Sequence, residues 1–157
     1  MIDLYSFPTP NGRKVSIALE EMEIPYSTIT VDINKNEQFD PEFLKISPNN
    51  KVPAIIDHEN GLSLMESGAI LLYLAKKSGC FLPSSCYWQA TEWLMFQVGG
   101  LGPMLGQAHH FLKFNAGKSL YSEERYLSEA KRLYGVLERR LAAEEYLIGD
   151  YSIADIA

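Results

Sequence analysis

The feature that most constrains the fold is the order of local patterns in the first 78 residues. Residues 2–7 alternate as in a strand, and apolar residues then recur at helical spacing from Lys14 to Leu19. A second β-rich segment occupies residues 26–31. A strand, a helix and a strand in this order imply two parallel strands joined by a right-handed crossover.

A second group of patterns follows this βαβ unit. The sequence predicts a short helix, two antiparallel strands and a longer helix over residues 41–46, 54–57, 62–64 and 66–78. The Asn60-Gly61 step between the two strands is a strong hairpin signal, and Gly79 is suited to end the last helix. The complete order, βαβ-α-ββα, predicts an α/β thioredoxin-like domain.

A change of composition marks a domain boundary after this region. Residues 79–87 include Pro83-Ser84-Ser85 and are interpreted as a linker. We therefore predict a thioredoxin-like domain over residues 1–78 and a partial all-helical domain over residues 88–157.

The second region contains three helical patterns. Residues 88–114 have helical periodicity, but the glycines from Gly99 onward and Pro103 are expected to kink this helix or split it. Residues 121–143 form a cleaner amphipathic helix. A third helix is predicted to begin with Ser152 as its N-terminal cap and Asp155 reaching back to the cap.

Composition excludes several functional classes. A net charge of −6 argues against general affinity for nucleic acid or an anionic membrane, which requires a concentrated basic surface. No apolar run is long enough to span a bilayer, so a cytoplasmic location is predicted. The two cysteines, Cys80 and Cys86, lack metal-ligand spacing; we expect Cys80 to end a buried helix and Cys86 to lie in the linker. No metal site is predicted.

Two short blocks, Lys51-Val52-Pro53-Ala54 and Glu66-Ser67-Gly68-Ala69-Ile70, have the properties of a ligand site. A proline at the start of a strand leaves a backbone edge free to pair with a peptide-like ligand. The second block begins a helix, whose free N–H groups and positive dipole end attract a carboxylate.

These blocks resemble the glutathione transferase superfamily. Three further segments, Thr9-Pro10-Asn11-Gly12, residues 46–53 and residues 97–107, are similar to its bacterial nu class of glutathione-dependent disulfide-bond oxidoreductases. The resemblance covers the whole chain. Members of the family continue for several more helices, so we expect a C-terminally truncated chain with apolar surface exposed on its preceding helices.

The resemblance implies that Thr9 and Asn11 bind the glutathione sulfur as a thiolate, or orient a disulfide for attack. The residues alone favour another interpretation, in which Thr9 caps the first helix and Asn11 lies in a turn. Tyr5 is a second candidate, because some transferase classes use a tyrosine near this position, although a packed aromatic is the simpler interpretation. Arg125 matches a helical arginine that reaches toward the bound sulfurs.

The remaining roles also follow from the resemblance. Val52 is expected to pair its backbone with the cysteinyl unit of glutathione, next to a cis bond to Pro53. Glu66 is expected to bind the γ-glutamyl ammonium and Ser67 its carboxylate, although a plain helix cap also explains this pair. Lys51 and Gln38 are assigned to the glycyl carboxylate; ordinary solvated side chains are the alternative.

The resemblance thus predicts a glutathione-dependent disulfide oxidoreductase that uses reduced or oxidised glutathione and no protein cysteine. Alternatives are glutathione transfer to an electrophile, reduction of an organic hydroperoxide, and a non-catalytic binding or regulatory module or inactive fragment. Family members are usually homodimers, and Phe43, Met65 and the helix from Trp88 are plausible contacts. The expected partners are glutathione and small disulfide or electrophilic substrates.

Overall fold

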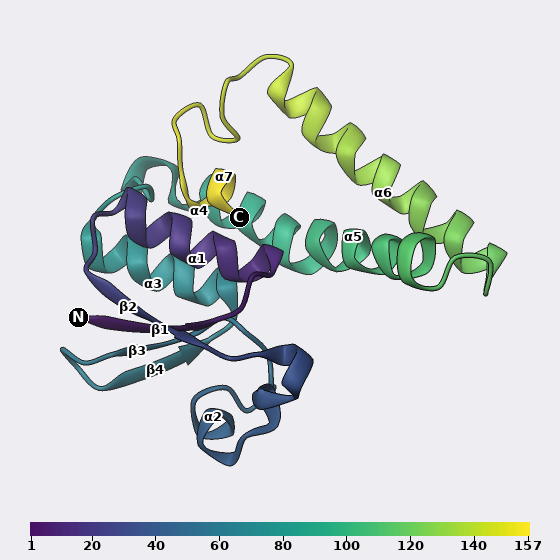
Figure 1. The fold of residues 1–157 in the computed structure, drawn as a ribbon. Coiled ribbons are helices and arrows are strands. Elements are labelled where there is room, and N and C mark those ends of the chain that lie inside the picture. The colour runs from purple at the N-terminus through teal and green to yellow at the C-terminus, as the bar shows by residue number, and fades with distance from the viewer. The chain divides into compact units, whose positions relative to one another are not determined.

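The computed structural model describes residues 1–157, which form two compact units: residues 1–84 together with 156–157, and residues 85–155. Figure 1 labels their helices and strands. The elements of the first unit are β1 (Ile2–Ser6), α1 (Pro10–Glu21), β2 (Tyr26–Thr30), α2 (Pro41–Ile46), β3 (Ala54–Asp57), β4 (Leu62–Met65) and α3 (Ser67–Ser78). This order confirms the predicted thioredoxin-like arrangement.

The four strands form one mixed sheet in the order β2-β1-β3-β4. β1 pairs in parallel with β2, placing Leu4 beside Thr28, and antiparallel with β3, placing Leu4 beside Ile55. β3 and β4 form the hairpin predicted from the Asn60-Gly61 step, and Gly61 has the positive φ of 72° that this tight turn requires. The hairpin thus follows directly from local sequence.

Helices cover both faces of this sheet. In Figure 1, α1 and α3 lie side by side over one face, and α2 lies on the opposite side of the strands. Leu4 and Ile55 are 1% and 0% exposed and form part of the core. On the α2 side, a smaller cluster forms around Val31, Phe43 and Ala54. Alternation along β1 and β3 divides their side chains between these two layers.

A buried carboxylate ties the hairpin to α3. Asp57 is 0% exposed; it accepts a 2.6 Å hydrogen bond from the Tyr73 hydroxyl and forms a 2.9 Å ion pair with Lys77. Burial by itself raises the pKa of Asp57, but the bonds from Tyr73, Lys77 and the Glu59 N–H outweigh it and lower the pKa to about 2. The carboxylate is therefore ionised and fully paired at neutral pH.

The second unit is helical. Its elements are α4 (Tyr87–Phe96), a π-helical segment (Gln97–Leu101), α5 (Gly102–His109), a second π-helical segment (His110–Phe114), α6 (Leu120–Leu141) and α7 (Ile153–Ile156). The glycine-rich stretch therefore stays helical by widening into a π turn. Pro103 has no N–H to continue the α-helical ladder, and the π turn precedes it directly.

The predicted cap of the last helix is confirmed. The Asp155 carboxylate accepts hydrogen bonds from the Ser152 N–H at 2.9 Å and from the Leu147 N–H at 2.8 Å. The Ser152 hydroxyl in turn accepts the Ala154 N–H at 3.2 Å. This reciprocal pattern is the capping box that the sequence spacing indicated.

Several surface features complete the description. Apolar side chains on α6 are exposed at seven-residue intervals, namely Leu120, Leu127, Tyr134 and Leu141.

Cys80 is exposed just beyond the C-cap residue Gly79, so the expectation that it ends a buried helix was wrong. No three His, Cys, Asp or Glu side chains are placed to hold a metal ion, and none of the helices is both long and apolar enough to cross a bilayer.

Candidate functional site

A pocket of about 190 Å³ lies where the ends of several elements of the first unit meet. It brings together the start of α1, the segment before β3, and the junction of β4 with α3. Its lining residues are Asn11, Ser47, Asn49, Lys51, Val52, Pro53, Met65, Glu66 and Ser67. Ligand pockets are commonly about 300–1,000 Å³. This pocket is therefore an open cleft that holds part of a ligand rather than enclosing it.

Val52 supplies a free backbone edge to the pocket. The Val52–Pro53 bond is cis, as the family resemblance implied, and β3 begins only at Ala54. Neither the N–H nor the C=O of Val52 makes a backbone hydrogen bond within the chain. The Ser47 hydroxyl, which is buried, donates to the Lys51 carbonyl at 2.8 Å and braces this segment. A peptide-like ligand can therefore pair with Val52 without displacing an internal bond.

The start of α3 forms the opposite wall. Glu66 precedes the helix with φ of 71°, a conformation that side-chain-bearing residues rarely adopt. Its carboxylate does not cap the helix but accepts a 3.3 Å bond from Asn49 Nδ2. Ser67, 8% exposed, is the first helical residue. The plain helix-cap alternative for Glu66 is therefore not what the structure contains, and the first N–H groups of α3 remain available to an anion.

At the start of α1, in contrast to α3, the helix-cap interpretation does hold, and the capping residue is Thr9. The Thr9 hydroxyl oxygen accepts the Gly12 N–H at 3.1 Å and caps the helix, as the alternative interpretation holds. This bond uses the oxygen as an acceptor and leaves the O–H proton available to donate. Thr9 itself does not line the pocket, whereas Asn11, two residues further along the helix, does.

Gly12 is required at this junction. A Cβ at this position would lie 2.7 Å from the Phe7 carbonyl oxygen and closer still to the Ser6 hydroxyl oxygen, so any other residue would force the preceding loop to shift.

Tyr5 packs instead of facing a ligand. Its ring lies 6.1 Å from that of Phe43, and both belong to the cluster on the α2 side of the sheet. Burial, followed by the nearby Asp3 charge, raises the pKa of Tyr5. A raised pKa makes this hydroxyl a poorer proton donor to a thiolate, in agreement with the packed-aromatic interpretation.

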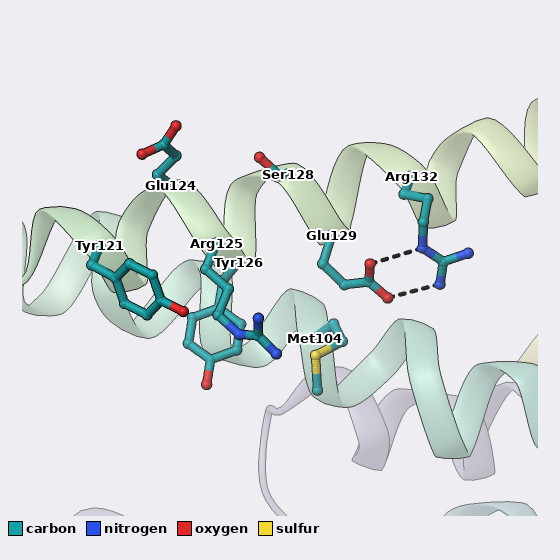
Figure 2. A pocket seen from close by; sticks show the side chains of 8 residues that line it. All are labelled: Met104, Tyr121, Glu124, Arg125, Tyr126, Ser128, Glu129 and Arg132. Carbon is teal, nitrogen blue, oxygen red and sulfur yellow. Dashed lines mark hydrogen bonds and ion pairs between the residues drawn. The ribbon is translucent and has the colours of Figure 1, made fainter.

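Besides Thr9, two predicted site residues lie outside this pocket. Gln38 does not line it, and the Gln38 Oε1 atom is buried without a hydrogen-bond partner. Arg125 belongs to α6 in the helical unit. It lines a second pocket of about 560 Å³, shown in Figure 2, together with Met104, Tyr121, Glu124, Tyr126, Ser128, Glu129 and Arg132.

The second pocket carries both charges and aromatic rings. Arg132 donates two hydrogen bonds to Glu129, from Nε at 2.8 Å and from Nη2 at 2.7 Å, and these lower the pKa of the Glu129 carboxyl. Tyr126 stacks on Phe111 with the ring centroids 5.4 Å apart. Arg125 makes no such bidentate pair and its guanidinium remains available for an anionic ligand (Figure 2).

The first pocket therefore gathers six of the nine residues predicted for the site: Asn11, Lys51, Val52, Pro53, Glu66 and Ser67. Sequence reasoning missed Ser47, Asn49 and Met65. The block Ile46-Ser47-Pro48-Asn49-Asn50 was recognised only as a family resemblance, although its polar side chains flank Lys51 directly. The closeness of Ser47 and Asn49 to Lys51 in the sequence is the signal that would have identified these two residues.

Comparison with known proteins identifies the family of the chain. The family model described as glutathione S-transferase, N-terminal domain, matches residues 1–76. Over its whole length the chain is similar to the disulfide-bond oxidoreductase YfcG of Escherichia coli (strain K12), with 56% identity across 77% of that protein. The chain belongs to the glutathione transferase family, as predicted.

Solved structures agree with the fold. A glutathione transferase from Burkholderia graminis, crystallised with two glutathione molecules per subunit, superposes with a TM-score of 0.95 and 51% identity over 99% of this chain and 69% of that one. A glutathione transferase from Pseudomonas putida, with one glutathione disulfide per subunit, gives a TM-score of 0.94 and 49% identity over 99% and 71% of the two chains.

Proposed function

We propose that this protein is a glutathione-dependent disulfide-bond oxidoreductase. The observation that carries the proposal is the free backbone edge of Val52 facing the unbonded N-terminus of α3 across one pocket. One side suits an extended peptide and the other suits its carboxylate. The similarity to YfcG, and the glutathione and glutathione disulfide bound in related structures, support the same ligand.

Each part of glutathione has a matching group. The cysteinyl unit pairs with the Val52 backbone, the γ-glutamyl ammonium with Glu66, and the γ-glutamyl carboxylate with Ser67 and the first N–H groups of α3. Lys51 binds the glycyl carboxylate, and Gln38, which the resemblance assigns to the same group, does not line the pocket. The pocket carries one positive and one negative exposed side chain, Lys51 and Glu66. This pair of charges suits glutathione, which itself carries both an ammonium and carboxylates.

The reaction is thiol–disulfide exchange. The thiolate of bound glutathione attacks one sulfur of the substrate disulfide, the disulfide bond breaks, and the leaving thiolate takes a proton from water. A second glutathione thiolate then attacks the mixed disulfide, releasing the reduced product and glutathione disulfide. Two glutathione thiols supply both electrons. Thr9 and Asn11 stabilise the attacking sulfur. The role of Arg125, which belongs to the helical unit, stays a prediction of the family resemblance.

The decisive experiment measures reduction of a small disulfide by glutathione, in the wild-type chain and in the double variant Cys80→Ser, Cys86→Ser. Both cysteines are free, and neither lines the pocket. Both proteins should therefore turn over at the same rate. Loss of activity in the double variant would contradict a mechanism in which the sulfur arrives only with glutathione.

Transfer of glutathione to an electrophile, and reduction of a hydroperoxide, use the same activated sulfur. Transfer to an aromatic electrophile is therefore the second candidate. Parallel assays on an aromatic electrophile and a small disulfide rank the two. Glutathione binding without turnover of either would indicate a binding or regulatory module. A homodimer stays a prediction of the family resemblance, and a cytoplasmic location stays a prediction of the sequence.

A further inference from the structure

Lys14 is a buried cation that has no role in the reaction proposed above. It lies on α1 and is 7% exposed, and it forms no ion pair and donates no hydrogen bond. Lysines are almost never buried unless a carboxylate pairs with them. The adjacent Arg13 shows the usual arrangement, since it is exposed to solvent. A buried, unpaired lysine requires a reason beyond packing.

The helix geometry places Lys14 one turn beyond a residue that lines the first pocket. Lys14 follows Asn11 by three residues, so the two side chains lie about 60° apart on one helix face with about 4.5 Å of axial rise between them. Helical side chains lean toward the N-terminus, and a lysine stem is long enough to cover this rise. Lys14 does not itself line the pocket, but it lies one helical turn beyond Asn11, which does, and its side chain is long enough to reach back to that turn.

This position matches the place where the reaction develops negative charge. Thr9 and Asn11 belong to the same turn and are the groups assigned to the glutathione sulfur. A cation near a thiol stabilises the thiolate, and a partly desolvated cation does so more strongly because water screens it less. The other charged groups at the pocket, Lys51 and Glu66, are exposed and carry opposite signs.

We propose that Lys14 is a positioning residue that keeps the sulfur of bound glutathione in its thiolate form. This inference rests on the proposed function. Burial lowers the pKa of Lys14 to about 8. Its side chain is therefore still about 90% protonated at pH 7, and a neighbouring thiolate favours the charged form further. Lys14 supplies charge and takes no proton in the exchange step.

The test compares Lys14→Met with Arg13→Met. Both variants remove one positive charge from neighbouring positions of α1, but only Lys14 is buried and aligned with Asn11. The ultraviolet absorbance of the glutathione thiolate, followed against pH in the bound complex, reports the pKa of the bound sulfur. Calorimetric affinity for S-methylglutathione, which has no ionisable sulfur, reports the rest of the site. Lys14→Arg tests rescue by another cation.

We expect Lys14→Met to raise the pKa of the bound thiol by about one unit, which is about tenfold less thiolate below that pKa. Affinity for S-methylglutathione should change less than about twofold, Arg13→Met should resemble the wild type, and Lys14→Arg should restore most of the thiolate. Cooperative melting of each variant verifies that it is folded.

Three outcomes overturn the proposal. An unchanged thiol pKa in Lys14→Met removes the electrostatic role. An equal loss of affinity for glutathione and S-methylglutathione assigns Lys14 to the structure of the pocket instead. If the wild-type protein binds neither glutathione nor S-methylglutathione, the proposed function is refuted and this inference with it. The wild-type titration alone distinguishes this outcome from the first two.

Discussion

Replacing Lys14 by methionine should make the protein more stable, in a manner that depends on pH. Methionine keeps the length and the helix propensity of lysine but carries no charge to desolvate. Burial lowers the pKa of Lys14 from 10.5 to about 8 in the folded chain. At about 1.36 kcal/mol per pKa unit, this difference corresponds to about 3 kcal/mol of free energy of unfolding that the buried ammonium costs.

The sign of the pH dependence follows from linkage. Below pH 8 the lysine is protonated in both the folded and the unfolded chain, so the full cost is present. Between pH 8 and 10.5 the unfolded chain binds more protons, so the stability of the wild type rises with pH. The advantage of Lys14→Met should therefore be largest at pH 7 and should shrink steadily above pH 8.

Urea unfolding, followed by circular dichroism at several pH values, measures this difference. With a slope of about 1–3 kcal/mol per molar urea, about 3 kcal/mol shifts the midpoint by roughly 1–3 M at pH 7. Arg13→Met is the matched control and should stay within about 0.5 kcal/mol of the wild type, because Arg13 is exposed. A Lys14→Met variant that is destabilised, or equally stabilised at pH 7 and pH 10, would show that the ammonium is not desolvated and would refute the reasoning.

Four further predictions test the site and the scaffold. Thr9→Ala should lower disulfide-reductase turnover by about 10²-fold, and Thr9→Ser, which keeps the helix cap, should retain it; equal turnover in both would move the role to other groups. Glu66→Gln should weaken glutathione binding by about 1.5–3 kcal/mol by calorimetry, and unchanged affinity would contradict the proposed ligand orientation. Folding lowers the pKa of Asp57 from 3.8 to about 2, so the ionised carboxylate adds about 2 kcal/mol to the free energy of unfolding above pH 4. This stabilisation is lost as the pH falls through 2, and the acid unfolding of Asp57→Asn should lack it. Asp155→Ala should lower the free energy of urea unfolding by about 2–4 kcal/mol, because it leaves the N–H groups of the capping box unpaired, and a shift below about 0.5 kcal/mol would argue against that cap.

A buried lysine that costs stability is informative about function. Positions where a chain departs from a general rule of folding tend to be functional, because selection retains a destabilising group only for a compensating gain. Lys14 on α1 and Glu66 before α3, with its positive φ, are two such departures. Glu66 lines the proposed glutathione pocket, and Lys14 lies one helical turn beyond Asn11, which also lines it. Stability and activity should therefore change in opposite directions in Lys14→Met.

The local elements of the fold could be predicted from the sequence. α2 and β3 have the bounds expected from their patterns, and the Asn60-Gly61 hairpin and the Ser152/Asp155 cap form as predicted. These features depend on residues within about four positions of one another, whose conformational preferences and hydrogen bonds are set by local chemistry. The glycine-rich helix was harder to predict, because a π turn that accommodates Pro103 leaves no simple periodicity.

By itself the sequence determined the order of the elements, the helix and hairpin ends, and the blocks that contain most of the pocket. Only the tertiary structure decided that Asn11, Asn49 and Ser67 meet in one pocket, that Tyr5 packs on Phe43, and that Lys14 is buried while Arg13 is exposed. The physical reason is that burial and charge environment depend on segments far apart along the chain. A helical pattern specifies which residues share a face, but the packing of α1 within the fold determines which of those residues lose contact with water.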